Sequence, residues 1–148
     1  PGPRWTLDLY ADHEELSGPA HRRTLQGFVA YETETLRWGL QYSHQDGEDN
    51  PPLELASGFL VAKAGARSNI ILRVDRLLEP SSRGDAIDYL PFDPSATATM
   101  LIAGLEFRSG SHYALTPNVV VKTYDRDDTG TRPDTDVHLR LTAFFDFE

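Results

Sequence analysis

The side chains best suited to chemistry are charged residues that recur at alternate positions along the chain. Asp8 and Asp12 could act together as general acid and base, but we expect them to pair with Arg37 or Arg140, because carboxylates and guanidinium groups form strong charged hydrogen bonds. The same alternating positions carry further charges of both signs. The predicted charge network comprises Asp8, Arg37, Arg73, Asp75, Glu106, Lys122, His138 and Arg140.

One acidic stretch partly matches the ligand spacing of a calcium loop. The segment "DRDDTGTRPDTD" at 125–136 has ligand-like side chains, but it lacks the final Glu and the flanking helices of an EF-hand. We interpret it as a solvated loop, and the tripeptide "RGD" at 83–85 likewise. The candidate ligands in the acidic stretch are Asp125, Asp127, Thr129, Gly130 and Asp136.

No catalytic fingerprint is present in the sequence. The five histidines have no metal-ligand spacing, and nucleophile-elbow, zinc-protease, Walker and dinucleotide motifs are all missing. We therefore predict no catalytic residue, no metal, no cofactor and no enzymatic activity. Because the formal charge is −9, nucleic acid is not an expected partner.

Length and composition predict one domain, residues 1–148. The chain has no cysteine, which excludes disulfides and thiolate sites. No segment approaches the roughly 18–20 continuous apolar residues that a membrane-spanning helix requires. The chain starts at Pro1 rather than Met. We therefore expect it to be a processed or excised piece of a longer product.

Apolar residues alternate with polar ones along most of the chain, which predicts β-strands. Each predicted strand has about nine to eleven residues, the length that crosses a bilayer when tilted. We predict an all-β, antiparallel, up-and-down barrel with eight strands. They cover residues 4–12, 24–32, 36–44, 53–63, 68–76, 99–108, 115–124 and 138–148.

The predicted connections alternate in length. Tight links fall at 33–35, 64–67 and 109–112, whereas longer polar segments separate the other strands. Outer-membrane barrels have short turns at one end and longer loops at the other. With the tight links at one end, six aromatic residues gather there and predict a membrane-interface girdle. They are Trp5, Tyr31, Trp38, Phe107, Phe145 and Phe147.

Periodicity alone leaves the orientation of the two faces open. In a transmembrane barrel the apolar face meets lipid and the charges line the lumen. In a soluble lipocalin-like barrel the same apolar face encloses a small hydrophobic ligand. A third possibility is a barrel that displays the segments 76–97 and 125–135 to a binding partner. Strand length, connection asymmetry and the girdle favour the membrane.

Three segments carry a resemblance to a known family. The runs "YLPFDPSATATMLIAGLEFR", "ALTPNVVVKTYD" and "RPDTDVHLRLTAFFDF" resemble the C-terminal part of bacterial outer-membrane porins of the phosphate-selective type. The resemblance implies that the barrel-assembly machinery reads a terminal aromatic residue, which Phe147 matches, with Phe145 and Leu141 at the alternate positions before it. Two features depart from the family: Glu148 extends the end, and porins have about sixteen strands.

We therefore expect a protein of the bacterial outer membrane with a passive role. Its expected partners are the lipid bilayer and the barrel-assembly machinery, and a small anionic solute is a further candidate. Eight strands closed on themselves leave room only for side chains, so the barrel would be a structural plug. As part of a larger barrel the strands would instead line an anion-attracting channel. The residues expected to line it are Arg37, Lys63, Arg73, Lys122 and Arg140.

Overall fold

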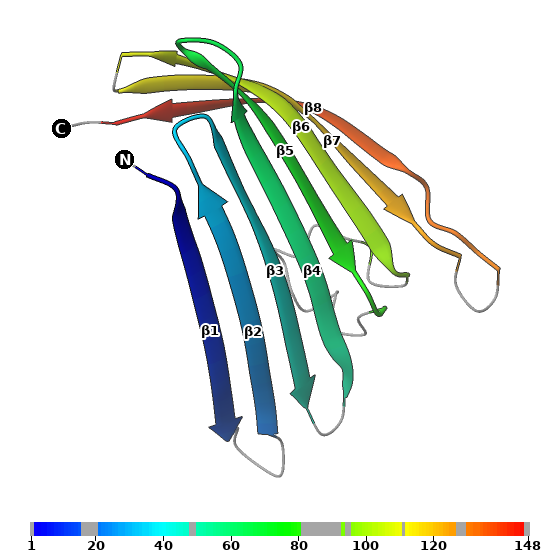
Figure 1. The fold of residues 1–148 in the computed structure, drawn as a ribbon. Coiled ribbons are helices and arrows are strands. Elements are labelled where there is room, and N and C mark those ends of the chain that lie inside the picture. Colours follow the sequence, from blue (N-terminus) through cyan, green and yellow to red (C-terminus); the bar gives the residue numbers. More distant parts are fainter. Residues whose placement is uncertain are drawn as a thin grey trace.

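The protein forms one eight-stranded antiparallel sheet in strand order β1 to β8, with each strand paired to its neighbours in sequence (Figure 1). The computed structural model describes residues 2–15, 21–47, 50–80, 93, 96–110, 112–126 and 130–146. The strands are β1 (Arg4–Glu15), β2 (His21–Glu32), β3 (Leu36–Gly47), β4 (Asn50–Lys63), β5 (Ser68–Leu77), β6 (Ala98–Ser109), β7 (Tyr113–Tyr124) and β8 (Asp136–Phe145). The predicted eight-stranded, antiparallel, up-and-down order is confirmed.

Several strands are longer than predicted, and most of the extra residues lie at the end away from the tight links, whereas β7 gains Tyr113 and Ala114 at the tight-link end. β3 continues to Gly47 and β4 begins at Asn50, so the predicted long connection between them is wrong. Backbone pairing does not depend on side-chain polarity, and Gly47 opposite Asn50 closes the ladder after a register shift. The alternation of short and long connections therefore fails between β3 and β4. It holds best around 78–97 and 125–135.

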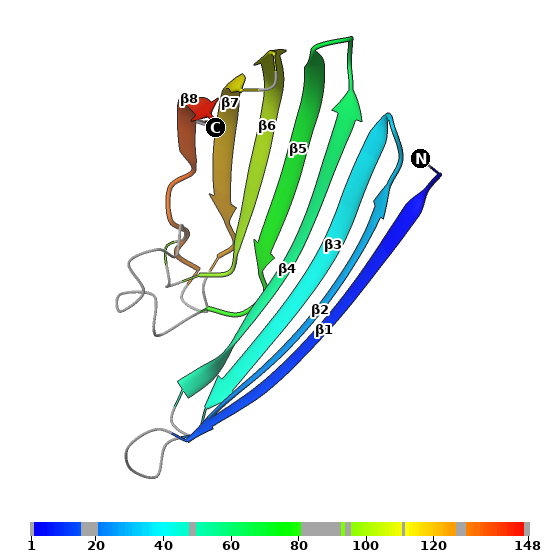
Figure 2. The same cartoon turned by 90° about the vertical axis from the view of Figure 1, so that its left-hand side faces the viewer.

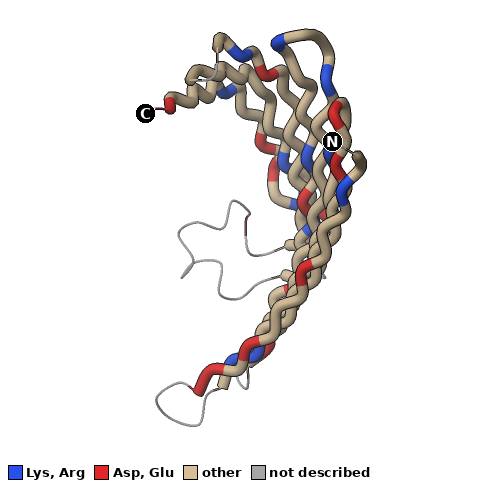
Figure 3. Tube along the Cα trace, turned by 60° about the vertical axis from the view of Figure 1, so that its left-hand side comes forward, with Lys and Arg blue, Asp and Glu red and all other residues tan. Residues whose placement is uncertain are grey.

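The sheet is curved and open. Figures 2 and 3 show the strands as a bent wall with one concave side. β1 and β8 are the two outer strands, and they do not pair with each other in the described part of the chain. The predicted closure of the barrel is thus not seen within this single sheet.

A small buried cluster identifies the concave face. It joins Leu77, Ala96, Ala98, Met100, Val120 and Tyr124. The backbone N–H of Asp93, in the connection between β5 and β6, donates to the Tyr124 hydroxyl at 3.2 Å. Side chains of this face are more buried than their neighbours: Met100 is 9% exposed, whereas the adjacent Leu101 is 47% exposed. Side chains converge on the inside of a curved sheet and diverge on the outside, so the opposite face is convex.

Candidate functional site

Two complete rows of uncharged, mainly apolar side chains cross all eight strands on the convex face. The ladder pairings place each member opposite the next. The first row is Trp5, Tyr31, Trp38, Leu60, Leu72, Ala103, Val119 and Leu139. The second row is Leu7, Val29, Leu40, Gly58, Val74, Leu101, Val121 and Val137. The sheet therefore presents one unbroken apolar surface, which we call the apolar band.

The apolar band is exposed even on the central strands. Leu72 on β5 and Leu101 on β6 are both exposed, although each strand has neighbours on either side. Soluble monomers rarely expose contiguous apolar patches beyond a few hundred Å². The apolar band is therefore unusual for the surface of a soluble monomer.

The band runs obliquely across the strands with a nearly constant height. On β1 it extends from Trp5 to Ala11, and on β8 from Phe145 back to Val137. The row that contains Trp5 reaches β8 at Leu139, well before Phe145. Both borders of the band shift in the same direction, as they do when tilted strands cross a slab of fixed thickness. Seven to nine residues at about 3.3 Å each span roughly 23–30 Å along a strand, close to the band of about 25 Å in outer-membrane barrels.

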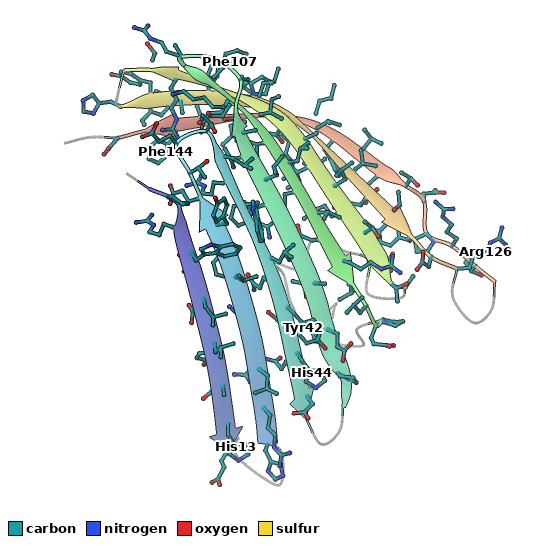
Figure 4. The ribbon with its side chains drawn as sticks, in the orientation of Figure 1. His13, Tyr42, His44, Phe107, Arg126 and Phe144 are labelled. Carbon is teal, nitrogen blue, oxygen red and sulfur yellow. The ribbon has the colours of Figure 1, made fainter. Side chains whose placement is uncertain are left out.

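Polar and ionisable residues mark the border of the band at the end away from the tight links. On the convex face, Ala11 is followed by His13, Leu25 is preceded by Arg23, and Ala56 by Glu54. His44 of β3 faces Glu54 of β4, with Nδ1 2.9 Å from Oε1. In Figure 4, His13 and His44 lie toward this end of the sheet, whereas Phe107 lies at the other.

Aromatic residues gather at the opposite border of the apolar band. Trp5 contacts Tyr31 at a ring-centroid distance of 4.8 Å and Trp38 at 5.7 Å. At the β7–β8 end of the same border, Phe145 packs edge-on against Tyr113 at a ring-centroid distance of 5.7 Å. Tyr113 was not among the predicted girdle residues, because the predicted strand began only at residue 115.

Two further girdle residues have different outcomes. Phe107 is exposed on the convex face of β6, opposite Leu115. Phe147 and Glu148 lie outside the described residues. The positions of the described members agree with a girdle, but their contact with a membrane interface stays a prediction.

All eight residues of the predicted charge network lie on the concave face, and its centre is connected. Asp75 is almost fully buried and accepts hydrogen bonds from the Arg73 guanidinium at 2.8 Å and the Ser57 hydroxyl at 2.6 Å. A buried charge is costly unless it is paired and hydrogen-bonded. The Arg73–Asp75–Ser57 contacts satisfy that requirement.

Two more groups of contacts extend the charge network along the concave face. Glu106 accepts hydrogen bonds from Asn69 and Arg108, each at 2.7 Å, and it also interacts electrostatically with Arg37. The Lys122 ammonium lies 3.7 Å from the Asp136 carboxylate. Asn69 and Glu106 link β5 to β6, Lys122 and Asp136 link β7 to β8, and the electrostatic interaction of Arg37 with Glu106 reaches from β3 to β6.

The charge network is incomplete at the two outer strands. The side chains of Asp8 on β1, and of His138 and Arg140 on β8, make no hydrogen bond or ion pair with the described residues. The expected pairing of Asp8 or Asp12 with Arg37 or Arg140 is not seen there. The strands that would bring the partners together are the unpaired edges of the sheet.

A stacked aromatic pair on the concave face was missed by the sequence analysis. Phe28 and Phe59 stack at 6.4 Å with their planes 16° apart, above Gly39 of the strand between them. A Cβ atom at Gly39 would lie 2.6 Å from the Phe59 ring and 3.0 Å from the Phe28 ring. The signal in the sequence was a glycine flanked, in register, by two phenylalanines that break the polar pattern.

One ion pair ties the end of β5 to the connection that follows β7. The Arg76 guanidinium donates to the Asp125 carboxylate, and the Thr97 hydroxyl donates to it at 2.8 Å. These hydrogen bonds, first that from Arg76 and then that from Thr97, hold the pKa of Asp125 below its usual range. The pair lies beyond the polar border of the apolar band.

The described residues contain no cluster of His, Asp or Glu arranged to hold a metal ion. Asp127 and Thr129 of the acidic stretch and the "RGD" segment at 83–85 lie outside the described residues. His13 and His21 pack ring to ring at 5.8 Å. In the described part of the chain, no helix has the length and apolar character to cross a membrane.

Comparison with known proteins adds no further information on identity. No protein-family model matches the sequence, and neither a curated protein nor a solved structure matches it. The resemblance to outer-membrane porins therefore stays a prediction.

Proposed function

We propose that this protein is a passive, non-enzymatic β-barrel of the bacterial outer membrane, with a porin-like wall. The observation that carries the proposal is the exposed apolar band on the convex face. Its oblique course and constant height match strands that cross a bilayer at a tilt. The aromatic residues at one border and the charged residues at the other match the two interfaces of a membrane.

The placement of the charges favours this proposal over a soluble lipocalin-like barrel. A soluble barrel would hold its ligand against apolar side chains on the concave side. Here the concave side carries Arg73, Asp75 and Glu106 with their hydrogen-bond partners. A polar interior and an apolar exterior are typical of membrane barrels.

The proposed partners follow from the middle of the apolar band and from its aromatic border. Lipid acyl chains would cover residues such as Leu72 and Leu101, and the headgroup region would meet Trp5 and Trp38. The barrel-assembly machinery would insert the chain. A small anionic solute is proposed only for the case in which these strands form part of a wider pore.

Insertion into lipid vesicles tests the proposal. The chain, diluted from urea into phospholipid vesicles, should bind them and leave protease-resistant strands with digestible connections. Without lipid or detergent it should aggregate, because the apolar band then faces water. A chain that stays monomeric and folded in plain buffer would contradict the proposal.

A further inference from the structure

The two outer strands expose an unpaired backbone edge. Within the described residues, β1 pairs with β2 alone and β8 with β7 alone. Nearly every residue of both strands is exposed, including Leu9 at 76% and Leu139 at 87%. Unpaired N–H and C=O groups have no partner in the hydrocarbon region, so membrane sheets close into barrels. Each edge therefore needs another strand.

The slant of the apolar band limits how the edges can meet. The row through Trp5 reaches Leu139, six residues before Phe145, where the band ends on β8. The aromatic border of the band is thus displaced by six residues, relative to the row through Trp5, over the seven strand pairings. At the same average step the displacement would be about seven residues once an eighth pairing, of β8 with β1, closes the barrel. We call this total displacement the slip. The total slip must be even, because a shift of one residue turns every side chain to the other face. Totals near seven are therefore six or eight.

The carboxylates on β1 and β8 exclude total slips of four and ten. A slip of four would place Asp12 opposite Asp136, and a slip of ten would place Asp8 opposite Asp146. Like charges directly opposite each other destabilise a strand pair. A slip of eight instead places Asp12 opposite Arg140, and neither has an ion-pair partner among the described residues.

Strand tilt distinguishes a total slip of eight from a total slip of six, because the total slip equals the shear of the closed barrel. An eight-stranded barrel with a shear of eight has a tilt of about 36°, within the range of about 35–45° for membrane barrels. A shear of six leaves the strands more upright. This step and the requirement that each edge be paired rest on the proposed membrane function, whereas the charge and band arguments do not.

We propose that β8 pairs antiparallel with β1 of the same chain, with Asp12 opposite Arg140 and Leu7 opposite Phe145, and closes an eight-stranded barrel. The pairing satisfies both backbone edges, adds an Asp12–Arg140 ion pair on the concave face and joins the two ends of the apolar band. The interior of an eight-stranded barrel is filled by side chains. The closed protein is therefore a membrane anchor or scaffold without a water-filled channel.

Cysteine pairs test the register directly, because the native chain has no cysteine. A slip of eight places Leu9 directly opposite Ala143, so the first variant is Leu9→Cys with Ala143→Cys. A slip of six places Leu9 opposite Leu141, so the second variant is Leu9→Cys with Leu141→Cys. In vesicles, copper–phenanthroline oxidation should link the first pair within one chain and leave the second largely reduced. Preferential linkage of the second pair would overturn the register, and linkage between two chains would overturn closure by the same chain.

Charge reversal gives an independent test that does not depend on disulfide geometry. Asp12→Arg and Arg140→Asp should each lower the yield of the Leu9–Ala143 crosslink, and the double reversal should restore it. Unchanged yields in both single variants would contradict the ion pair. Reconstituted protein should give no single-channel conductance steps, and such steps would contradict the filled interior.

The outcomes separate closure from membrane insertion. A crosslink within one chain of a protein that is soluble in plain buffer would support closure and contradict the membrane proposal. Protein that inserts into vesicles but links only between chains would support the membrane proposal and contradict closure.

Discussion

Val74 and Asp75 are consecutive residues of β5, yet Val74 is 43% exposed and Asp75 is 2% exposed. In most soluble proteins the valine would be inside and the aspartate outside. Here the carboxylate is buried on the concave face with Arg73 and Ser57 as partners, and the valine belongs to the convex apolar band. The same arrangement, with exposed apolar side chains on the convex face and charged side chains on the concave face, recurs along the sheet.

The first prediction uses two adjacent residues of β3 that lie on opposite faces. Leu40 belongs to the second apolar row, and Gln41 faces the concave side. Leu40→Arg should make folding into vesicles less favourable by about 2–4 kcal/mol, the cost of arginine near the bilayer midplane. Urea titration in the presence of vesicles measures this change.

Gln41→Arg is the matched control, since the same charge then lies among polar groups. It should cost less than half as much as Leu40→Arg. An equal or larger loss in Gln41→Arg would mean that the convex face is not the lipid-facing one.

A second prediction concerns the depth of the two tryptophans. Trp5 and Trp38 are the only tryptophans in the chain, and their rings meet edge-on at the aromatic border of the band. Lipids brominated near the headgroup should quench their fluorescence more than lipids brominated near the chain end. Stronger quenching from the bilayer centre, or none from either lipid, would count against an interfacial position.

A third prediction tests the aromatic pair on the concave face. Gly39→Ala would push a methyl group into the Phe59 ring, so the Phe28–Phe59 stack must shift. We expect a loss of about 1–3 kcal/mol, as for other overpacked sites. Gly27→Ala is the control, because its Cβ would lie 3.7 Å from Leu9, an ordinary contact. Equal unfolding midpoints for the two variants would argue against the stacked arrangement.

A fourth prediction follows from the Arg76–Asp125 pair. The pKa of Asp125 is lowered in the folded protein, so its contribution to stability is present above the unfolded pKa and disappears as the pH falls through the folded one. Asp125→Asn should therefore destabilise the protein at pH 7 by at most about 1 kcal/mol, since the pair is largely exposed. At a pH well below the lowered pKa of Asp125, the variant and the native protein should unfold alike.

Asp134→Asn, at an exposed position of the same connection, is the control and should have little effect at either pH. Unfolding in detergent, followed by tryptophan fluorescence, measures both variants. A loss for Asp125→Asn that is the same at both pH values would indicate a role other than its charge.

The faces of the strands could be predicted from the sequence because period-two alternation assigns each side chain to a side. The predicted members of the charge network, from Asp8 to Arg140, all lie on one face for this reason. Even β4, where Ser57, Phe59 and Val61 blur the pattern, takes the side that its neighbours dictate through the register.

Other features could not be predicted, since they depend on partners rather than on local pattern. The ends of β3 and β4 were missed because backbone pairing continues through polar residues. The Phe28–Phe59 stack depends on the register of three strands. Closure depends on what meets β1 and β8, and alternation within a strand carries no information on that pairing.

Spin labels along β5 test the central claim most directly. Single cysteines at each position from Ile70 to Arg76, labelled and reconstituted in vesicles, report their access to oxygen and to a water-soluble relaxation agent. Oxygen access should peak at Ile70, Leu72 and Val74, the exposed members of the apolar band on this strand. Peaks at Ile71, Arg73 and Asp75, or water access without alternation, would contradict the assignment of the convex face to lipid.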